Sequence, residues 1–458
     1  MEFNYQDYLK GIDYPCSFDR YKSVDSSILR KLEKSIDKEG NMIERTYAEL
    51  RRRTTEDYYD KVHKAQVKAL DYSNKVFPTY KFIMPDALAD DWLSTVDWHK
   101  KYPSRDHSLH QTLTAYIVNR LLGGGNPELS FKLRRGSDNN LLDYCASRIL
   151  DSSGMAYLIH YFEDLDPSFS KHDISYKRRW ARDVFYEAAM IAALFHDMGY
   201  PWQYINSLKK AIGTADTGLS DDAIRSAKAT MDAIRSRLLI YPFFGYSESN
   251  LKHPSQMMTE AALSMIDLGL RETHGLPGAL GFMTLNDRVR INSSGRHPDD
   301  ANYRLVLDWA AVAIMMHDMP KIYWNEDGKT VRNPILRLSF EVDPLSCLIS
   351  LADILEEFHR PSASFMKGMK EVDGKTIECV NLTYDFPCVG SEIKIVGKKL
   401  HVNYYYKNQK IAGDEEERRR DEVNQYLRLS DGYIDLTPWG VTDVVCNTIQ
   451  QKNDVNIE

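Results

Sequence analysis

The chain has 458 residues, of which 43 % are hydrophobic and 27 % are charged, and its net charge at pH 7 is -7. Its length exceeds what one compact core usually holds and predicts two or three domains, while its ordinary composition excludes collagen-like and low-complexity proteins. The negative net charge argues against a general nucleic-acid coat, so we expect no stable nucleic-acid binding.

The cysteine pattern and the N-terminal residues indicate the cellular compartment in which the protein works. The six cysteines are scattered, without a C-x-x-C pair: Cys16, Cys145, Cys347, Cys379, Cys388 and Cys446. This pattern favours reduced thiols over disulfides or a structural zinc site. The first residues, MEFNYQDYLKG, lack the basic start and apolar run of a signal peptide, and no segment has the apolar length of a membrane span. We therefore expect a cytoplasmic protein that has no membrane partner.

Three regions follow one another along the chain. Residues 1–90 read as a helical N-terminal extension, because residues 25–75 are strongly charged and carry apolar residues only intermittently at helical spacing. Residues 91–362 read as a helical core. Residues 363–458 read as a small α+β region, because IECVNLTYDF, SEIKIVG and KKLHVNYYYK alternate like strands and DEEERRRDEVNQYLRL reads as a charged helix. The predicted fold class is therefore mainly α.

The core is predicted to contain five apolar helices. Their ranges are Leu109–Gly125, Ala181–Phe195, His253–Leu270, Val306–Met316 and Pro344–Arg360. The polar stretch Thr284–Arg304 reads as a long loop or substrate lid, with Arg288, Arg290 and Arg296 as candidate cations.

Ionisable side chains lie within these helices or at their ends. They are His107, His110, His196, Asp197, His253, His317, Asp318 and Asp353. A single histidine is usually a core or surface residue with one hydrogen bond. Asp353 is harder to explain in that way, because it lies among apolar residues and a lone buried carboxylate costs several kcal/mol. Because all five helices deliver such groups, and imidazole and carboxylate are ligands of divalent transition metals, one shared metal site would account for them.

These residues resemble the HD superfamily of metal-dependent phosphohydrolases over roughly residues 100–360. HDMGYP, from His196 to Pro201, is similar to the central H-D-x-G element, LADILEEFHR to the last helix, and RDHSLHQTLTAYIVNRLLGG to the first helix. The resemblance implies an HD-type helical bundle, with His196, Asp197 and Asp353 as metal ligands.

A second metal is implied by the resemblance to the HD-GYP branch. His253-Pro254 is similar to its H-P-x-x-G element, and His317 stands where that branch has another histidine ligand. The chain lacks a Gly-Tyr-Pro signature after His317, and Tyr200 stands where the family has a lysine after H-D-x-G. Specificity for cyclic dinucleotides is therefore not carried over.

Two choices arise within the ligand set. For the first ligand, the nucleotide-hydrolase branch favours His107, whereas His110 shares a helix face with Leu113 and Ile117; we favour His110 as the ligand and His107 as proton donor or phosphate contact. For the central pair, His196-Asp197 leaves room for further helices before Asp353 and His317-Asp318 does not. Asp318 is then expected to orient a ligand histidine.

The predicted function is hydrolysis of a phosphoester or phosphodiester in a nucleotide, a small nucleic-acid-derived substrate or another phosphorylated small molecule. One or two divalent ions (Mn, Fe, Co, Ni or Zn, with Mg as a further candidate) would activate water, Asp197 would bridge them, and His107 or His253 would protonate the leaving oxygen. Candidate phosphate-binding cations are Arg105, Lys252, Lys321 and Arg360. The alternatives are a nucleotide-binding HD protein that senses without turnover and an HD-type di-iron oxygenase. The flanking regions offer surface for a homo-oligomer.

Overall fold

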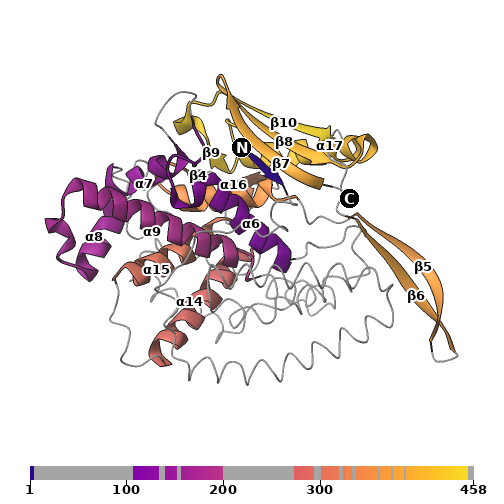
Figure 1. Cartoon of the computed structure of the whole chain (residues 1–458), viewed down its shortest axis with the longest axis horizontal. Helices are drawn as coiled ribbons and strands as arrows, with labels where there is room; N and C mark the ends of the chain where they lie inside the picture. The colour runs from indigo at the N-terminus through magenta and orange to yellow at the C-terminus, as the bar shows by residue number, and fades with distance from the viewer. Residues whose placement is uncertain are drawn as a thin grey trace.

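The computed structural model describes residues 1–4, 107–133, 140–151, 156–199, 273–292, 301–318, 323–326, 329–332, 337–357, 362–372, 375–385 and 388–451. Two layers of secondary structure are recognisable in this part of the chain: a group of helices, and a four-stranded sheet with its own helix (Figure 1). The described part is mainly helical, as the sequence predicted.

The helical layer is built around α9 (Ile174–Phe195), whose second half is almost completely buried. It packs against α6 (His107–Leu121), α7 (Leu141–Asp151), α15 (Ala301–Met316) and α16 (Pro344–Leu355). Two further helices complete the layer: α8 (Ala156–Leu165) packs on α7, and α14 (Gly275–Asn292) packs on α15. The apolar runs seen in the sequence are therefore the buried faces of one helical core.

Local signals set the beginnings of three helices. The Asp173 carboxylate accepts a hydrogen bond from the Tyr176 amide at 2.8 Å at the start of α9. Asp343 caps α16 in the same way, with Pro344 at the first helical position, and Asn408 caps α17 (Gln409–Leu427). These side chains satisfy amides that have no partner within the helix.

The sheet has the strand order β1-β7-β8-β10. Its strands are β1 (Glu2–Asn4), β7 (Cys388–Val396), β8 (Lys399–Tyr406) and β10 (Asp443–Gln450). The pairs β1–β7 and β7–β8 are antiparallel, whereas β8 and β10 are parallel, and α17 forms the crossover that such a parallel pair requires. This sheet and α17 together are called the sheet layer below.

Short pairings connect or extend the two layers. Strand β4 (Leu338–Ser339) lies next to α16 and pairs in parallel with β9 (Ile434–Asp435), which joins the helical layer to the sheet layer. Strands β2 (Tyr323–Glu326) and β3 (Lys329–Arg332) form one hairpin. A longer hairpin, β5 (Ser362–Val372) with β6 (Lys375–Asp385), extends away from both layers (Figure 1). Three 3-10 turns, Gly123–Gly125, Phe169–Lys171 and Thr437–Trp439, complete the described elements.

Three predictions about elements are wrong. The stretch Thr284–Arg304 was predicted to be a loop, but residues 284–292 belong to α14 and residues 301–304 to α15. The polar composition suggested a loop, and the packing of α14 on α15 overrides it. The last core helix ends at Leu355 instead of Arg360, as Glu356 already has an extended backbone. Residues 2–4 of the predicted helical extension form a strand, because β7 offers them an open edge.

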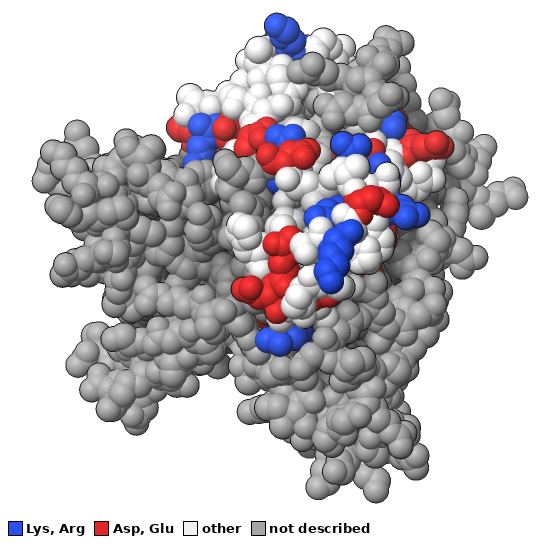
Figure 2. Space-filling model, turned by 90° about the vertical axis from the view of Figure 1, so that its left-hand side faces the viewer, with Lys and Arg blue, Asp and Glu red and all other residues white. Residues whose placement is uncertain are grey.

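Two predicted helical segments, residues 25–75 and His253–Leu270, lie outside the described residues. In the part of the chain that the structure describes, no helix has both the length and the hydropathy needed to cross a membrane. One face of the molecule, shown in Figure 2, carries Lys and Arg side chains interspersed with Asp and Glu.

Candidate metal centre

Four helix ends and one helix interior meet at a buried cluster. His110 lies in the first turn of α6, His196 and Asp197 directly follow α9, and His274 directly precedes α14. His317 and Asp318 directly follow α15, and Asp353 lies within α16. The members are called the His-Asp centre below: His110, His196, Asp197, His274, His317 and Asp353. Each of these residues is at most 4 % exposed.

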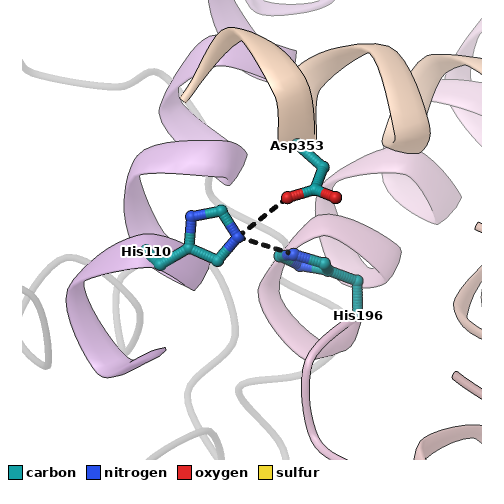
Figure 3. Close-up of side chains that lie close together, drawn as sticks. All are labelled: His110, His196 and Asp353. Carbon is teal, nitrogen blue, oxygen red and sulfur yellow. Dashed lines mark hydrogen bonds and ion pairs between the residues drawn. The ribbon is translucent and has the colours of Figure 1, made fainter. Parts of the chain in front are cut away.

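The first half of the His-Asp centre is formed by His110, His196 and Asp353 (Figure 3). The His110 Nε2 atom lies 3.1 Å from His196 Nε2 and 3.1 Å from Asp353 Oδ1. Asp197 approaches the same nitrogen, with Oδ2 at 3.3 Å. Three helices that are far apart in sequence thus direct ligand-type atoms to one point.

The second half is formed by His274, His317 and the other oxygen of Asp197. The Nε2 atoms of His274 and His317 are 3.1 Å apart, and Asp197 Oδ1 lies 2.9 Å from the first and 3.8 Å from the second. His196, Asp197 and His317 also converge within 4.8 Å of one another. Asp197 Oδ2 faces His110, whereas Oδ1 faces His274 and His317. Because Oδ1 also lies 3.3 Å from His196 Nε2, the Asp197 carboxylate is in contact with both halves.

The Nδ1 atom of each histidine lies next to an oxygen acceptor. His196 Nδ1 donates to the carbonyl of Ala193 at 2.8 Å, and His317 Nδ1 donates to the carbonyl of Ile314 at 2.6 Å. His110 Nδ1 lies 2.5 Å from Glu356 Oε2, and His274 Nδ1 lies 2.9 Å from Asp318 Oδ2. Because a carbonyl oxygen only accepts, the proton of the neutral His196 and His317 rings is on Nδ1, and their Nε2 carries a lone pair. His110 and His274 have a carboxylate oxygen beside both ring nitrogens, so a metal ion at Nε2 would leave their remaining proton on Nδ1.

The charge balance of the His-Asp centre and the distances between its nitrogen atoms indicate whether metal ions fit. With all four imidazoles neutral and protonated on Nδ1, four lone pairs would lie beside two carboxylates in a buried volume, an arrangement that bound cations or added protons relieve. Donor nitrogens bonded to one ion at about 2.0–2.1 Å lie about 3 Å apart in neighbouring positions, and the observed Nε2 separations within each half are 3.1 Å. The residues present therefore fit divalent metal ions.

The pKa values of two histidines move in opposite directions. Burial lowers the pKa of His196 to about 3, so this imidazole is neutral at pH 7. Burial also opposes a charge on His274, but the neighbouring carboxylates of Asp318 and Asp197 outweigh it and raise the pKa of His274 to about 9. Without metal, a proton on His274 thus supplies part of the positive charge that Asp197 and Asp318 require.

Two glycines allow the ends of α9 and α15 to approach the start of α14. A Cβ atom on Gly199 would lie 1.8 Å from the carbonyl oxygen of His274, and one on Gly275 would lie 2.7 Å from the carbonyl oxygen of Ile314. Only glycine permits backbones to approach this closely. The glycine of the HDMG motif therefore has a structural role: it lets the backbone carrying His274 lie against the chain that leaves Asp197.

The structure places most of the predicted ligands together, and it adds two residues that the sequence interpretation missed. His274 was not singled out, although its segment THGLPG combines a histidine with glycines at a helix start. Glu356 was not singled out either; the signal is its position three residues after Asp353. The proposed orienting role of Asp318 applies to His274, since Asp318 Oδ2 also accepts from the His274 amide at 2.9 Å.

Several predicted site residues have no described side chain. His107 is the first residue of α6, and its side chain is not among those described. His253 and the four candidate phosphate-binding cations lie outside the described residues: Arg105, Lys252, Lys321 and Arg360. Arg288 and Arg290 lie on α14, but their side chains are not among those described. Arg296 lies outside the described residues. The roles assigned to all of them stay predictions.

Compared with known proteins, the chain matches no protein-family model, no curated protein and no solved structure.

Proposed function

We propose that this protein is a metal-dependent phosphohydrolase of the HD type, acting on a phosphoester or phosphodiester of a nucleotide or a related small molecule. The observation that carries the proposal is the convergence of four histidine Nε2 atoms on two carboxylates, with each Nδ1 held by an oxygen acceptor. Such acceptors fix the tautomer and orientation of metal-ligating histidines. The motif order His110, His196-Asp197, His317, Asp353 adds the resemblance to the HD superfamily.

A bound divalent ion lowers the pKa of water to near neutrality and polarises a phosphoryl oxygen. The chain supplies the surroundings for this chemistry. Asp197 would be a ligand common to both halves of the centre, and its carboxylate would orient water at the site. The neutral His196 would keep its lone pair available over the whole physiological pH range, because its pKa lies near 3. Protonation of the leaving oxygen is assigned to His107 or His253.

Hydrolysis is tested with purified protein loaded with Mn²⁺, Co²⁺ or Zn²⁺ on nucleoside triphosphates, cyclic nucleotides, alarmones and short single-stranded nucleic acids. Asp197→Ala and Asp353→Ala should lose activity by about a thousandfold or more, because metal ions contribute several kcal/mol to such reactions. Asp343→Asn, a change at the other end of the helix that carries Asp353, serves as the matched control and should keep wild-type activity.

The same experiment separates the alternatives. Equal activity of the wild type and both alanine variants would refute the proposal. Oxygen consumption without phosphate release would favour the di-iron oxygenase. Metal and nucleotide binding without turnover of any substrate would favour the sensing protein.

A further inference from the structure

The carboxylate of Glu356 lies on the side of His110 that faces away from the other ligands. Its Oε2 atom is 2.5 Å from His110 Nδ1, and both side chains are fully buried. A hydrogen bond from an imidazole N–H to a carboxylate is charge-assisted, fixes the ring, and makes the opposite nitrogen a stronger ligand. The position of Glu356 therefore bears directly on how His110 presents Nε2 to Asp353 and His196.

Glu356 itself is placed by the sheet layer. It is the first residue after α16, and the last carbonyls of this helix accept hydrogen bonds from the sheet. The Tyr404 hydroxyl donates to the carbonyl of Ile354 at 2.6 Å, and the Ser391 hydroxyl donates to the carbonyl of Leu355 at 2.9 Å. Carbonyls at a helix end have no partner within the helix, so these hydroxyls complete the end of α16 and determine where the chain leaves it.

The residue after Glu356 is held by α17. The Glu357 carboxylate lies 2.5 Å from an Arg418 nitrogen and 2.8 Å from an Arg419 nitrogen. Arg419 is fully buried and its guanidinium lies 5.4 Å from the centre of the Tyr404 ring. Because a buried charge that loses its partner is strongly destabilising, this ion pair holds the Glu357 backbone tightly to the sheet layer.

We propose that Glu356 is a positioning residue for His110, and that the sheet layer acts on the His-Asp centre through Glu357 and Arg419. The inference rests on the proposed metal site. It adds the sheet layer to that site, although the sequence analysis treated residues 363–458 as a region separate from the helical core. Contacts on Ile354, Leu355 and Glu357 leave Glu356 little freedom to turn away from His110. The sheet layer is then part of the metal centre's support, although it supplies no ligand.

The test is titration of metal-stripped protein with Co²⁺, followed by calorimetry and by the visible absorption of the bound ion. Glu356→Gln keeps the shape of the side chain and removes its charge. We expect a 10- to 100-fold loss of Co²⁺ affinity, the usual effect of losing such a partner, and an altered Co²⁺ spectrum. Glu392→Gln is the matched control: it removes a buried carboxylate of the same layer that bonds Asn403 and Lys394, and it should leave affinity and spectrum unchanged.

To test whether α17 contributes to the position of Glu356, a variant is needed that still folds. Arg419→Met alone would leave Glu357 with Arg418 as its remaining cation, so Arg419→Met is combined with Glu357→Gln. Glu422 also pairs with Arg419, and in the variant it keeps an Arg418 nitrogen at 3.9 Å. We expect this double variant to bind Co²⁺ several-fold more weakly than the wild type, with a spectrum shifted in the same direction as that of Glu356→Gln.

The outcomes distinguish the inference from the proposed function. A wild type that binds no Co²⁺ overturns the metal-dependent function, and the inference with it. Tight binding by the wild type together with unchanged affinity and spectrum in Glu356→Gln overturns the positioning role alone. Wild-type binding by the Arg419→Met/Glu357→Gln variant overturns the part played by α17.

Discussion

The histidines of the His-Asp centre differ in how strongly they hold a proton. The pKa of His274 is raised to about 9, so its charge contributes stability to the metal-free fold that is fully present below pH 6.5 and is lost as pH rises through about 9. A metal ligand must be deprotonated. We therefore expect metal uptake at pH 7 to release roughly one proton from His274, measured by calorimetry in buffers of different ionisation enthalpy.

Asp318→Asn serves as the comparison for this proton release. It removes the largest contribution that raises the pKa of His274, so the variant should release fewer protons at pH 7 than the wild type. Metal uptake by the wild type without any proton release would contradict the assignment of His274 as a charged residue of the metal-free centre.

The close approach at Gly199 gives a second prediction at the residue scale. In Gly199→Ala, the new Cβ would meet backbone of His274 and Gly278, which cannot rotate away. The start of α14 must move, so we expect the variant to bind metal at least tenfold more weakly and to unfold at a lower temperature, as measured by Co²⁺ titration and calorimetric melting.

Gly413→Ala is the control for that substitution. Gly413 lies on the exposed face of α17 and a Cβ there would meet nothing within 4 Å. Alanine should stabilise this helix by about 0.5–1 kcal/mol. If Gly199→Ala behaved like Gly413→Ala, the backbone packing described for Gly199 would be wrong.

At the scale of elements, α16 carries both Asp353 and an unusual cap. Asp343 is fully buried; its Oδ1 accepts from the Ser346 amide, and its Oδ2 has no hydrogen-bond partner within the described ranges. Burial raises the pKa of Asp343 from 3.8 to about 6, against the effect of the Ser346 hydrogen bonds. The folded state therefore binds this proton more tightly, and the contribution of Asp343 to stability falls as pH rises from 3.8 to about 6.

Asp343→Asn keeps the cap and removes the charge. We expect its free energy of unfolding at pH 7 to equal or exceed that of the wild type, and the dependence on pH between about 4 and 6 to weaken. Asp343→Ala loses the cap and should be destabilised by about 1 kcal/mol. Urea melts at several pH values measure both, and a less stable asparagine variant at pH 7 would contradict the prediction.

Four of the five helices that carry members of the His-Asp centre were predicted from the sequence: α6, α9, α15 and α16. The segments around α9, α15 and α16 are strongly apolar, and α16 begins at Pro344 as the sequence indicated. The helices that the sequence did not predict were α7, α8 and α14, although the start of α14 carries His274. For α14 the reason is visible in its sequence: it starts with GLPG and continues with polar residues, and its helical state depends on packing against α15.

At the scale of the whole molecule, metal binding is expected to be a large part of the stability. A ligand that binds only the folded state at a hundred times its dissociation constant adds about 2.7 kcal/mol to the free energy of unfolding. We expect Mn²⁺ or Co²⁺ to raise the melting temperature of stripped protein in a concentration-dependent way, and chelation to reverse the change. Thermal unfolding followed by circular dichroism measures it.

Asp353→Asn is the control for the metal-dependent rise in melting temperature. It removes one carboxylate charge from the first half of the centre and hardly changes the volume of the side chain. Its melting temperature should respond only weakly to the same metals. Identical melting of stripped and metal-supplemented wild type would contradict a resident metal.

The sequence by itself determined the mainly helical class and pointed to His110, His196, Asp197, His317 and Asp353, because buried helices with ionisable groups at their ends carry a strong local pattern. Only the tertiary structure brought in His274 and Glu356 and joined the first strand to the sheet layer. These depend on contacts between segments up to several hundred residues apart. No local periodicity encodes which carboxylate will face which imidazole after the helices have packed.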